Sequence, residues 1–450
     1  MPQTRISRRQ LIAGTAAFKA SAISAPFVRS ANAAGRLTLG LWDHWVPGAN
    51  DACSKLIDEW AAREKIDVTV DYITSQGNKL LLTIAAEAQA RAGHDVIMLG
   101  NWLPIEYGEL LEPVDDVMKA LVSEHGSAND AANSYGRYEG KWVGIPSIRG
   151  TFTYPCVSRM DLLKQHAGVD VTAMYPASST PNTALADTWT YDAFLEAAAK
   201  CHRANLPFGL PLGQTADAIQ WVGSMFSAFG AELVDAKGNV TVDSDAVREV
   251  LDYSRRLKAL LPRDVPAWDD ASNNKWLVSG KGALIINAPS AWAVAKRDAP
   301  AIAAQIWHHP MPKGAKGRFT AVMMQYLSIW KFSKNKSAAR SLIAHLSTRS
   351  AAETLITASN GYDLPSFDSM NTIKVWDEQG PPLGTTSHYA TRPGSDQRFA
   401  FVAAPAPASI AAQINSQATM PKMILRHWRG ETIEKTIDWA AQELESFARR

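Results

Sequence analysis

The chain has 450 residues, of which 46% are hydrophobic and 20% are charged, and its formal net charge is +2. That length permits two or more hydrophobic cores, and the composition excludes a disordered chain. Residues 1–33 carry five basic side chains and no acidic one, so removing them from +2 leaves −3 for residues 34–450. A mildly acidic surface argues against nucleic acid as a partner.

The N-terminal stretch has the pattern of an export signal. Residues 7–12 contain the Arg-Arg pair of a twin-arginine motif, an apolar run follows to Phe27, and Ala31-Asn32-Ala33 is a small-x-small cleavage pattern. The apolar run is too short and too interrupted to span a bilayer, and no cysteine lies in or just after it to carry a lipid. We therefore predict a twin-arginine signal peptide over residues 1–33, cleaved near Ala33, and a mature protein free in the periplasm.

The region after the signal alternates between strand and helix patterns. Apolar residues at every second position predict strands, and apolar residues at helical spacing between capping residues predict helices. The predicted elements are strands over residues 36–41, 66–72 and 95–99 and helices over residues 50–63 and 78–91. This rhythm indicates a parallel sheet with helices on its faces, which is an α/β lobe.

The loops at the carboxyl ends of these three strands are polar, and two of them contain tryptophan. They are Trp42-Asp43-His44-Trp45, Thr74-Ser75-Gln76-Gly77 and Gly100-Asn101-Trp102. Ligands of parallel α/β sheets bind outside the carboxyl ends of the strands. The loops therefore predict a binding site there, although each tryptophan taken alone is as well explained by a place in the core.

Residues 137–158 are rich in aromatic and β-branched residues and form two extended runs, 137–145 and 149–157. The first run turns at Glu139-Gly140. We interpret the stretch as a hinge crossing between two lobes, and the alternative is an ordinary hairpin inside one domain. In a crossing, four side chains could project into the cleft between the lobes: Ser147, Arg149, Thr151 and Thr153.

The rest of the chain is mostly helical in pattern. Helices are predicted over residues 159–166, 189–203, 214–229, 243–260, 273–278, 289–297, 336–346, 351–358, 420–428 and 432–447, and strands over 281–286 and 325–330. Residues 169–187 and 379–398 are predicted to be irregular, and residues 360–365 form a loop at a later crossing.

No sequence motif for a catalytic constellation, a metal site or a cofactor is present. The chain lacks GxGxxG, GxxxxGK[ST], HExxH and GxSxG. The adjacent pairs His308-His309 and Asp269-Asp270 are expected to be packed or solvated residues. The three cysteines, Cys53, Cys156 and Cys201, are far apart without a CxxC, and whether the last two pair stays open. We predict that the protein is not an enzyme and has no cofactor.

Several motifs occur in an order and at spacings that together resemble a known family. They are Gly93-His94-Asp95-Val96, residues 110–116, Gly140-Lys141-Trp142-Val143-Gly144-Ile145-Pro146, residues 279–284 with 287–292, residues 333–339 and residues 429–432. The sequence resembles family 1 extracellular solute-binding proteins, the sugar-binding subunits of ABC importers in the maltose-binding-like cluster.

This resemblance implies a type II periplasmic-binding-protein fold, in which two α/β lobes close on one ligand by hinge bending. The first lobe would comprise residues 34–147 and about 322–365, and the second about 148–321 and 366–450. The resemblance implies a monomer that docks onto the permease subunits of an ABC importer in the inner membrane. By family position, the ligand-binding residues would be Trp42, Asp43, His44, Trp45, Asn101, Trp102, Arg149, Gln214, Gln220, Trp221, Asn287, Ser290, Trp292, Tyr362 and Asp363.

The sequence departs from the family at Ser290, where some oligosaccharide binders carry a stacking tryptophan, and at Arg149, which is not a general feature. Both departures argue against a long maltodextrin. We therefore predict a monosaccharide, a disaccharide or a sugar alcohol as the ligand. Two alternatives stay open: Arg149 could bind an anionic solute such as a sugar acid or a glycerol phosphate ester, and a periplasmic enzyme acting on glycosides is less well supported.

Overall fold

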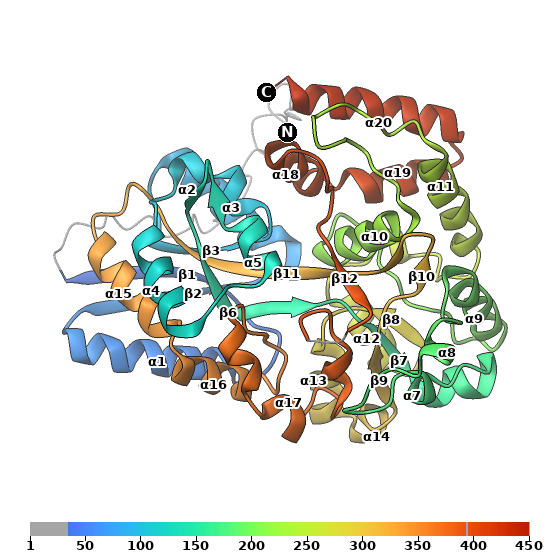
Figure 1. The fold of residues 1–450 in the computed structure, drawn as a ribbon, viewed down its shortest axis with the longest axis horizontal. Coiled ribbons are helices and arrows are strands. Elements are labelled where there is room, and N and C mark those ends of the chain that lie inside the picture. The colour runs from blue at the N-terminus through green and yellow to red at the C-terminus, as the bar shows by residue number, and fades with distance from the viewer. Residues whose placement is uncertain (1–34, 393–394, 450) are drawn as a thin grey trace, which may run out of the picture.

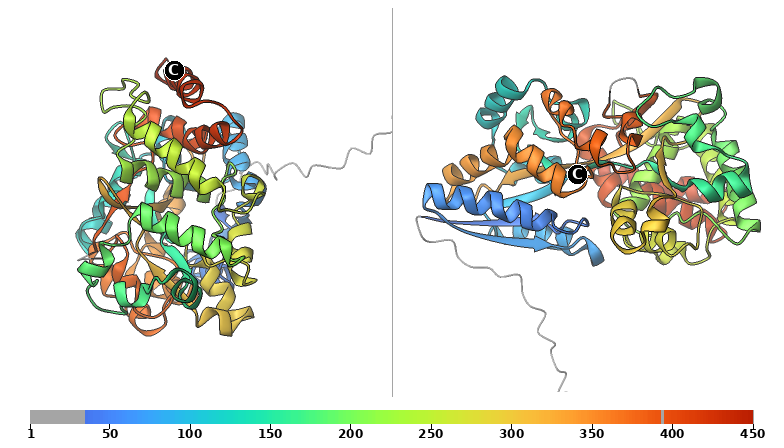
Figure 2. Two further views of the ribbon diagram at one scale, coloured as in Figure 1. Left: turned by 90° about the vertical axis from the view of Figure 1, so that its right-hand side faces the viewer. Right: turned by 90° about the horizontal axis from the view of Figure 1, so that it is seen from below.

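The structure is a computed structural model that describes residues 35–392 and 395–449. The predicted signal peptide, residues 1–33, lies outside the described residues. Figure 1 shows two groups of elements side by side, with the strands β6 and β11 running between them, and Figure 2 shows the same two groups from below. We call the group with β1–β3 the first lobe and the group with β7–β9 the second lobe.

A seven-stranded mixed sheet extends from the first lobe, where β1, β2 and β3 lie, toward the second lobe (Figure 1). Its strands are β1 (Arg36–Trp42), β2 (Asp67–Ile73), β3 (Val96–Gly100), β6 (Ile145–Thr153), β10 (Lys313–Gly314), β11 (Gly317–Ile329) and β12 (Gln397–Ala400). The path runs β2-β1-β3-β11, and β6, β10 and β12 all pair with β11. β1 is parallel to β2 and β3, as the sequence predicts, whereas β11 is antiparallel to β3 and β6.

Helices cover this sheet because their apolar residues lie along one face, at helical spacing, and pack against the strands. In α1, residues 53, 56, 57 and 60 are buried, which is the i, i+3, i+4, i+7 stripe of an amphipathic helix. The helices of the first lobe are α1 (Ala49–Glu64), α2 (Lys79–Ala90), α3 (Leu103–Glu106), α4 (Asp115–His125), α5 (Asp130–Tyr135), α15 (Lys336–Leu346), α16 (Arg349–Ala358) and α17 (Val375–Glu378). The short hairpin of β4 (Arg137–Tyr138) and β5 (Lys141–Trp142) turns at Glu139-Gly140, as predicted.

The second lobe contains a smaller sheet in which β7 (Cys156–Arg159) lies between β8 (Leu284–Ile286) and β9 (Ile306–His309). β7 is antiparallel to both neighbours, whereas parallel pairing occurs among β1, β2 and β3 and between β11 and β12. The surrounding helices are α6 (Met160–Leu162), α7 (Val171–Met174), α8 (Thr183–Ala186), α9 (Tyr191–Arg203), α10 (Ala216–Phe229), α11 (Asp245–Lys258), α12 (Ser272–Val278), α13 (Ser290–Asp298), α14 (Pro300–Ala303), α18 (Ala408–Ser416), α19 (Thr419–Trp428) and α20 (Ile433–Ala448).

The chain crosses between the two sheets where the sequence predicts a crossing. β6 ends at Thr153 in the large sheet, and β7 begins at Cys156 in the small one. β11 is a second connection, because its last residues pair with β3 while Arg318 to Ala321 pair with β12. The alternative of an ordinary hairpin inside one domain is therefore wrong.

Several predicted boundaries differ from the structure for identifiable reasons. β11 begins at Gly317 instead of residue 325, because a buried arginine interrupts its apolar pattern; Arg318 donates to the carbonyls of Trp189 and Met311 and pairs with Asp396. Residues 169–187, predicted as irregular, contain α7 and α8. The sequence pattern predicts neither β9, which has four residues, nor α18, which begins after Pro407 without a side-chain cap.

The predicted lobe boundaries remain a prediction, and one set of contacts favours a shift. Phe367 forms a bridge with Ala128, and the N–H of Asn129 donates to the carbonyl of Ser366. Residues 366–372 therefore lie against the first lobe, which favours a boundary near residue 380 rather than 365. Within the described residues all three cysteines are buried and unpaired, so Cys156 and Cys201 do not form a disulfide here. No helix in this part of the chain is long and apolar enough to span a membrane.

Candidate functional site

Four aromatic rings meet where the first lobe faces the crossing. Trp42 ends β1, His44 follows it, Phe152 lies on β6 and Tyr362 follows α16. The ring of His44 lies 4.9 Å from those of Trp42 and Tyr362, and the ring of Phe152 lies 4.9 Å from that of Tyr362. We call these four residues the aromatic cluster, and all four are buried.

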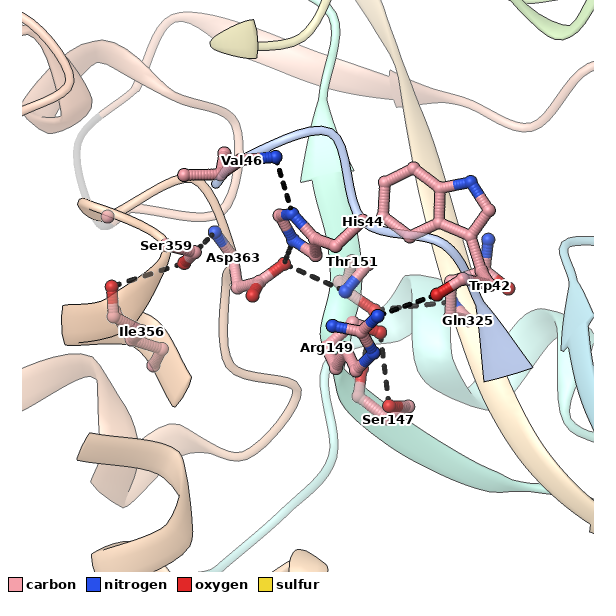
Figure 3. Close-up of polar contacts among 12 residues, drawn as sticks. Trp42, His44, Val46, Ser147, Arg149, Thr151, Gln325, Ile356, Ser359 and Asp363 are labelled. Atoms are coloured by element: carbon pink, nitrogen blue, oxygen red, sulfur yellow. Dashed lines mark hydrogen bonds and ion pairs between the residues drawn. The ribbon is translucent and has the colours of Figure 1, made fainter. Parts of the chain in front are cut away.

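A buried carboxylate fixes the histidine of the aromatic cluster (Figure 3). His44 Nδ1 accepts from the N–H of Val46 at 2.9 Å, so Nε2 carries the proton and donates to Asp363 Oδ1 at 3.1 Å. The same Oδ1 accepts from the N–H of Gly150 at 2.7 Å. Burial lowers the pKa of His44 despite the attraction of Asp363, so the imidazole is neutral and acts as a hydrogen-bond donor.

Arg149 lies next to this group and is 2% exposed. Its Nη2 donates to the carbonyl of Trp42 at 2.6 Å and to Asn50 Oδ1, and its guanidinium carbon lies 5.1 Å from the centroid of the Tyr72 ring. Its Nε and Nη1 have no hydrogen-bond partner among the described residues. Asn50 Nδ2 donates to Asp43 Oδ1 at 2.7 Å, so Asp43 belongs to the same hydrogen-bond network as Arg149.

Two hydroxyls of β6 that we expected to face the cleft between the lobes form hydrogen bonds within the strand. Ser147 Oγ donates to the carbonyl of Arg149, and Thr151 Oγ1 donates to that of Ser147, so both are used inside the strand (Figure 3). Thr151 Oγ1 also accepts from the N–H of Gln325 at 3.2 Å. The side-chain Oε1 of Gln325 is buried without a partner in the described structure. Gln325 therefore adds an unsatisfied acceptor to the site that the sequence did not predict.

A chain of amides runs through the facing part of the second lobe. Asn273 Nδ2 donates to Asp217 Oδ2 at 2.8 Å, and Asn287 Nδ2 donates to Asn273 Oδ1 at 3.0 Å and to Asn274 Oδ1 at 2.8 Å. Asn274 Nδ2 donates to Ser290 Oγ at 3.0 Å. The predicted site residues Asn287 and Ser290 therefore lie together, in a network that begins at an acidic group on α10.

Asp217 connects this network to the crossing. Its backbone N–H donates to Asp270 Oδ1 at 3.3 Å, and its carboxylate is hydrogen-bonded to the hydroxyl of Tyr154, which follows β6. Burial, together with the charge of Asp270, raises the pKa of Asp217 well above its usual range. Burial raises the pKa of Asp270 as well. The prediction that Asp269-Asp270 is a solvated pair is therefore wrong for Asp270, which is partly buried.

The residues after β3 contact other segments. The backbone N–H of Asn101 donates to the carbonyl of Met324, and its Oδ1 accepts from the N–H of Met324, both at 2.8 Å. Trp102 Nε1 donates to the carbonyl of Val402 at 3.0 Å, and its ring lies 4.7 Å from that of Tyr135 in an edge-on contact. Trp102 thus joins the first lobe to the C-terminal segment rather than to the aromatic cluster.

Three further residues that we predicted as ligand-binding, Trp221, Trp292 and Gln214, do not lie next to one another. Trp221 is in the core of the second lobe, where its Nε1 donates to the carbonyl of Pro211 at 2.7 Å. The ring of Trp292 lies 4.9 Å from the ammonium of Lys296. Gln214 is exposed.

Two further predicted residues lie at the edges of this arrangement. Trp45 is partly buried against the hydrophobic core. Gln220 is 2% exposed, and its Oε1 has no partner within residues 35–392 and 395–449. Gln220 lies one turn along α10 from Asp217, on the same face of the helix.

Sequence reasoning missed several residues that the structure brings to this place. The spacing of Asp217 three residues before Gln220 was a usable signal, because both fall on one helical face. The network of asparagines had no signal, because Asn273 and Asn274 are ordinary residues of a short helix. The missed residues are Asn50, Phe152, Tyr154, Asp217, Asp270, Asn273, Asn274 and Gln325.

The facing side chains of the two lobes are buried against one another. Two of the surface hollows on the described part of the chain lie away from these side chains. One is lined by six charged residues of α11, and the other lies among α1, α4 and α15. Lys296 Nζ on α13 donates to Asn360 Oδ1 after α16 at 3.2 Å, so the two lobes are in contact two residues from Tyr362.

Residues 55–381 match the model of a family described as bacterial extracellular solute-binding protein. No curated protein matches the chain. Among solved structures, the maltose-bound MalE3 of T. maritima is 18% identical with a TM-score of 0.74, and the alignment covers 92% of this chain and 100% of that chain. A tagatose-bound solute-binding protein of an ABC transporter from Thermotoga lettingae is 18% identical with a TM-score of 0.72 and coverages of 92% and 100%. A chitin oligosaccharide binding protein is 18% identical with a TM-score of 0.71 and coverages of 92% and 99%.

These likenesses show the two-lobed periplasmic-binding-protein fold. The family match extends over most of the chain, and the family is one of binding proteins that act outside the cytoplasm, which excludes the glycoside-acting enzyme. The chain belongs to the bacterial extracellular solute-binding proteins.

Proposed function

We propose that the protein captures a carbohydrate, either a mono- or disaccharide or a sugar alcohol, between its lobes and delivers it to the permease of an ABC importer. One observation carries the proposal: the contact between the lobes combines aromatic faces with buried polar atoms that lack partners. Tyr362 Oη, Gln325 Oε1 and Gln220 Oε1 have no hydrogen-bond partner among the described side chains. A sugar presents the complementary surface, with C–H faces for the rings and hydroxyls for the polar atoms.

The energies of such contacts are sufficient. An aromatic contact contributes on the order of 1 kcal/mol beyond buried area, and a hydrogen bond to a charged group contributes roughly 1.5–3 kcal/mol. A micromolar dissociation constant corresponds to about 8 kcal/mol. A few contacts from Trp42, Tyr362, Asp217 and Asn287 therefore suffice. The proteins of similar fold whose names refer to maltose, tagatose and chitin oligosaccharide support this class of ligand.

Titration calorimetry against a panel of monosaccharides, disaccharides and alditols tests the proposal. We expect saturable binding of at least one panel member, which is recovered chemically unchanged after release. Absence of binding, or binding only of amino acids, peptides or metal ions, would contradict it. Mass spectrometry of a small molecule that co-purifies with the protein provides an independent identification.

Arg149 supports a second candidate, an anionic solute such as a sugar acid or a glycerol phosphate ester. The observation that favours it is the buried guanidinium, whose Nε and Nη1 find no acceptor in the described chain. Affinity for an anion should fall steeply with added salt, whereas affinity for a neutral sugar should not. The Arg149→Gln variant should lose binding only of the anion.

We further propose that the chain is exported by the twin-arginine route, is cleaved near Ala33 and acts as a periplasmic monomer. The Arg-Arg pair and the small-x-small pattern of residues 1–33 support the route. Replacing Arg8 and Arg9 by Lys should leave the precursor in the cytoplasm, which fractionation of the cells would detect.

A further inference from the structure

Two carboxylates at the contact between the lobes lack a cationic partner. Asp217 is 5% exposed, and its carboxylate is bound by Asn273 and Tyr154. Asp270 accepts from the N–H of Asp217. The ion pairs of the described residues include no lysine or arginine on either carboxylate. Because burial without a cation raises the pKa of both carboxyl groups, a donor of positive charge would stabilise their ionised form.

Unpartnered polar atoms lie beside the two carboxylates. Tyr362 is 1% exposed and its hydroxyl has no partner within the described chain. The ring of Phe152 lies 4.9 Å from that of Tyr362 and 5.3 Å from that of Tyr154, whose hydroxyl binds Asp217, so one aromatic ring connects Tyr362 to the carboxylates. On α10, the buried Oε1 of Gln220 is a second unpartnered group. Every one of these groups can accept a hydrogen bond, and the carboxylates and Oε1 can only accept.

An acceptor-rich, cation-poor set of this kind is complementary to an ammonium group. An ammonium has three donors and no acceptor. It also binds favourably over aromatic faces, and the rings of Tyr362, Phe152 and Trp42 lie within 6.4 Å of one another, centroid to centroid. A neutral hydroxyl would satisfy fewer of the acceptors and would leave the charge unpaired.

We propose that Asp217 and Asp270, together with Tyr362 and Gln220, form a subsite for the protonated amine of an amino sugar or amino cyclitol. The inference rests on the proposed function, because it assumes that a sugar-like solute binds between the lobes. It adds a charge preference: an amine-bearing ligand binds more tightly than the parent that carries a hydroxyl in its place.

Calorimetry on the wild-type protein near neutral pH tests the preference. Two sets of probes are compared: glucose, glucosamine and N-acetylglucosamine, and galactose, galactosamine and N-acetylgalactosamine. We expect at least one free amine to bind tenfold or more tightly than both its hydroxyl parent and its N-acetyl derivative, which has no charge. A parent sugar that binds as tightly as its amine would overturn the subsite and leave the proposed function intact. If none of these probes binds while another sugar of the panel does, the subsite is overturned alone, and absence of binding by every neutral sugar and alditol as well would overturn both.

The Asp217→Asn variant tests the residue. It should lose the preference for the amine, so that the amine and its hydroxyl parent bind with similar affinity, while the control Asp264→Asn, an exposed carboxylate of the same lobe, should keep the preference. Retention of the full preference by Asp217→Asn would refute the role of this carboxylate. If circular dichroism shows that Asp217→Asn is unfolded, Asp270→Asn replaces it, with the same expected loss.

Discussion

His44 Nε2 and Asp363 Oδ1 lie 3.1 Å apart although the two residues are separated by 319 positions in the chain. The same carboxylate oxygen accepts from the N–H of Gly150, so one buried acceptor joins three segments. These segments are the loop after β1, the crossing strand β6 and the loop after α16 (Figure 3). Because all three segments carry residues of the proposed site, this carboxylate organises the first-lobe half of the site.

The Asp363→Ala variant should be strongly destabilised. It leaves the N–H of Gly150 and the Nε2–H of His44 buried without an acceptor, and each such group costs roughly 1–3 kcal/mol. We therefore expect the free energy of unfolding to fall by about 2–6 kcal/mol in urea denaturation. The control Asp368→Ala removes an exposed carboxylate five residues later and should change the free energy little. Equal losses in the two variants would show that the buried acceptor contributes nothing specific.

Trp42 should contribute directly to ligand binding. The Trp42→Ala variant removes the largest ring of the aromatic cluster, and we expect the affinity for the bound sugar to fall at least tenfold in calorimetry, which corresponds to about 1.4 kcal/mol. Trp42→Phe keeps part of the ring and should show an intermediate loss. The control Trp60→Phe alters a fully buried tryptophan of α1, whose Nε1 donates to Ser341, and should reduce stability without changing affinity. Unchanged affinity in Trp42→Ala would show that the site is placed wrongly.

The protein should lose stability in mild acid through its buried histidines. Burial lowers the pKa of His308 and of His309 to about 3. The unfolded chain therefore binds more protons than the folded one between about pH 6.5 and 3, so stability falls as the pH falls through this window. The slope is about 1.4 kcal/mol per pH unit for each such histidine at most. Urea denaturation at several pH values should give a shallower slope for His309→Gln.

His94 provides the control for this pH dependence, because its charge has the opposite effect. Although its own burial opposes protonation, hydrogen bonds to Glu87 and Asp71 raise the pKa of His94. Its contribution to stability is therefore complete below the unfolded pKa and is lost as the pH rises through the folded pKa. His94→Gln should lower stability throughout acid pH and leave the slope below about pH 6.5 unchanged. A wild-type protein whose stability does not fall between pH 6.5 and 4 would contradict the prediction.

The sequence predicts the first lobe well because its signals are local. Residues 36–39 alternate between partly buried and buried positions, and the predicted helix over residues 336–346 coincides with α15, so local periodicity is sufficient there. The crossing is also predicted, because glycine and proline interrupt a run of β-forming residues. Local patterns fail at β11, where a buried arginine is satisfied by carbonyls from distant segments.

The site is predicted only in part because its contacts are not local. The loop after β1 and the loop at Tyr362-Asp363 are both identified in the sequence, but their meeting depends on the fold. The tryptophans illustrate the limit. Trp42 joins the aromatic cluster, whereas Trp221 is a core residue, and no composition or spacing distinguishes the two. Asp270 shows the same limit for an acidic residue. Its sequence context indicates a surface position, but the fold places it against Asp217 of α10, where it is partly buried.

Gly150 should be intolerant of any side chain. Its φ is +77°, a conformation that costs an L-residue about 1–2 kcal/mol, and a Cβ there would lie 3.0 Å from Gln325 Cγ and from Trp42 Cε3. Gly140, at the turn between β4 and β5, has a φ of +80° and no atom within 4 Å of such a Cβ. Gly140→Ala thus measures the backbone cost alone.

We expect Gly140→Ala to lower the free energy of unfolding by about 1 kcal/mol and Gly150→Ala to lower it by at least about 1 kcal/mol more. Because the new methyl group would press on Trp42, Gly150→Ala should also weaken sugar binding, whereas Gly140→Ala should not. Urea denaturation and calorimetry on both variants measure the two effects. If the two alanines proved equally costly and neither altered affinity, the close packing of β6 against Trp42 would have no role in binding, and the crossing strand would serve only as a connection between the lobes.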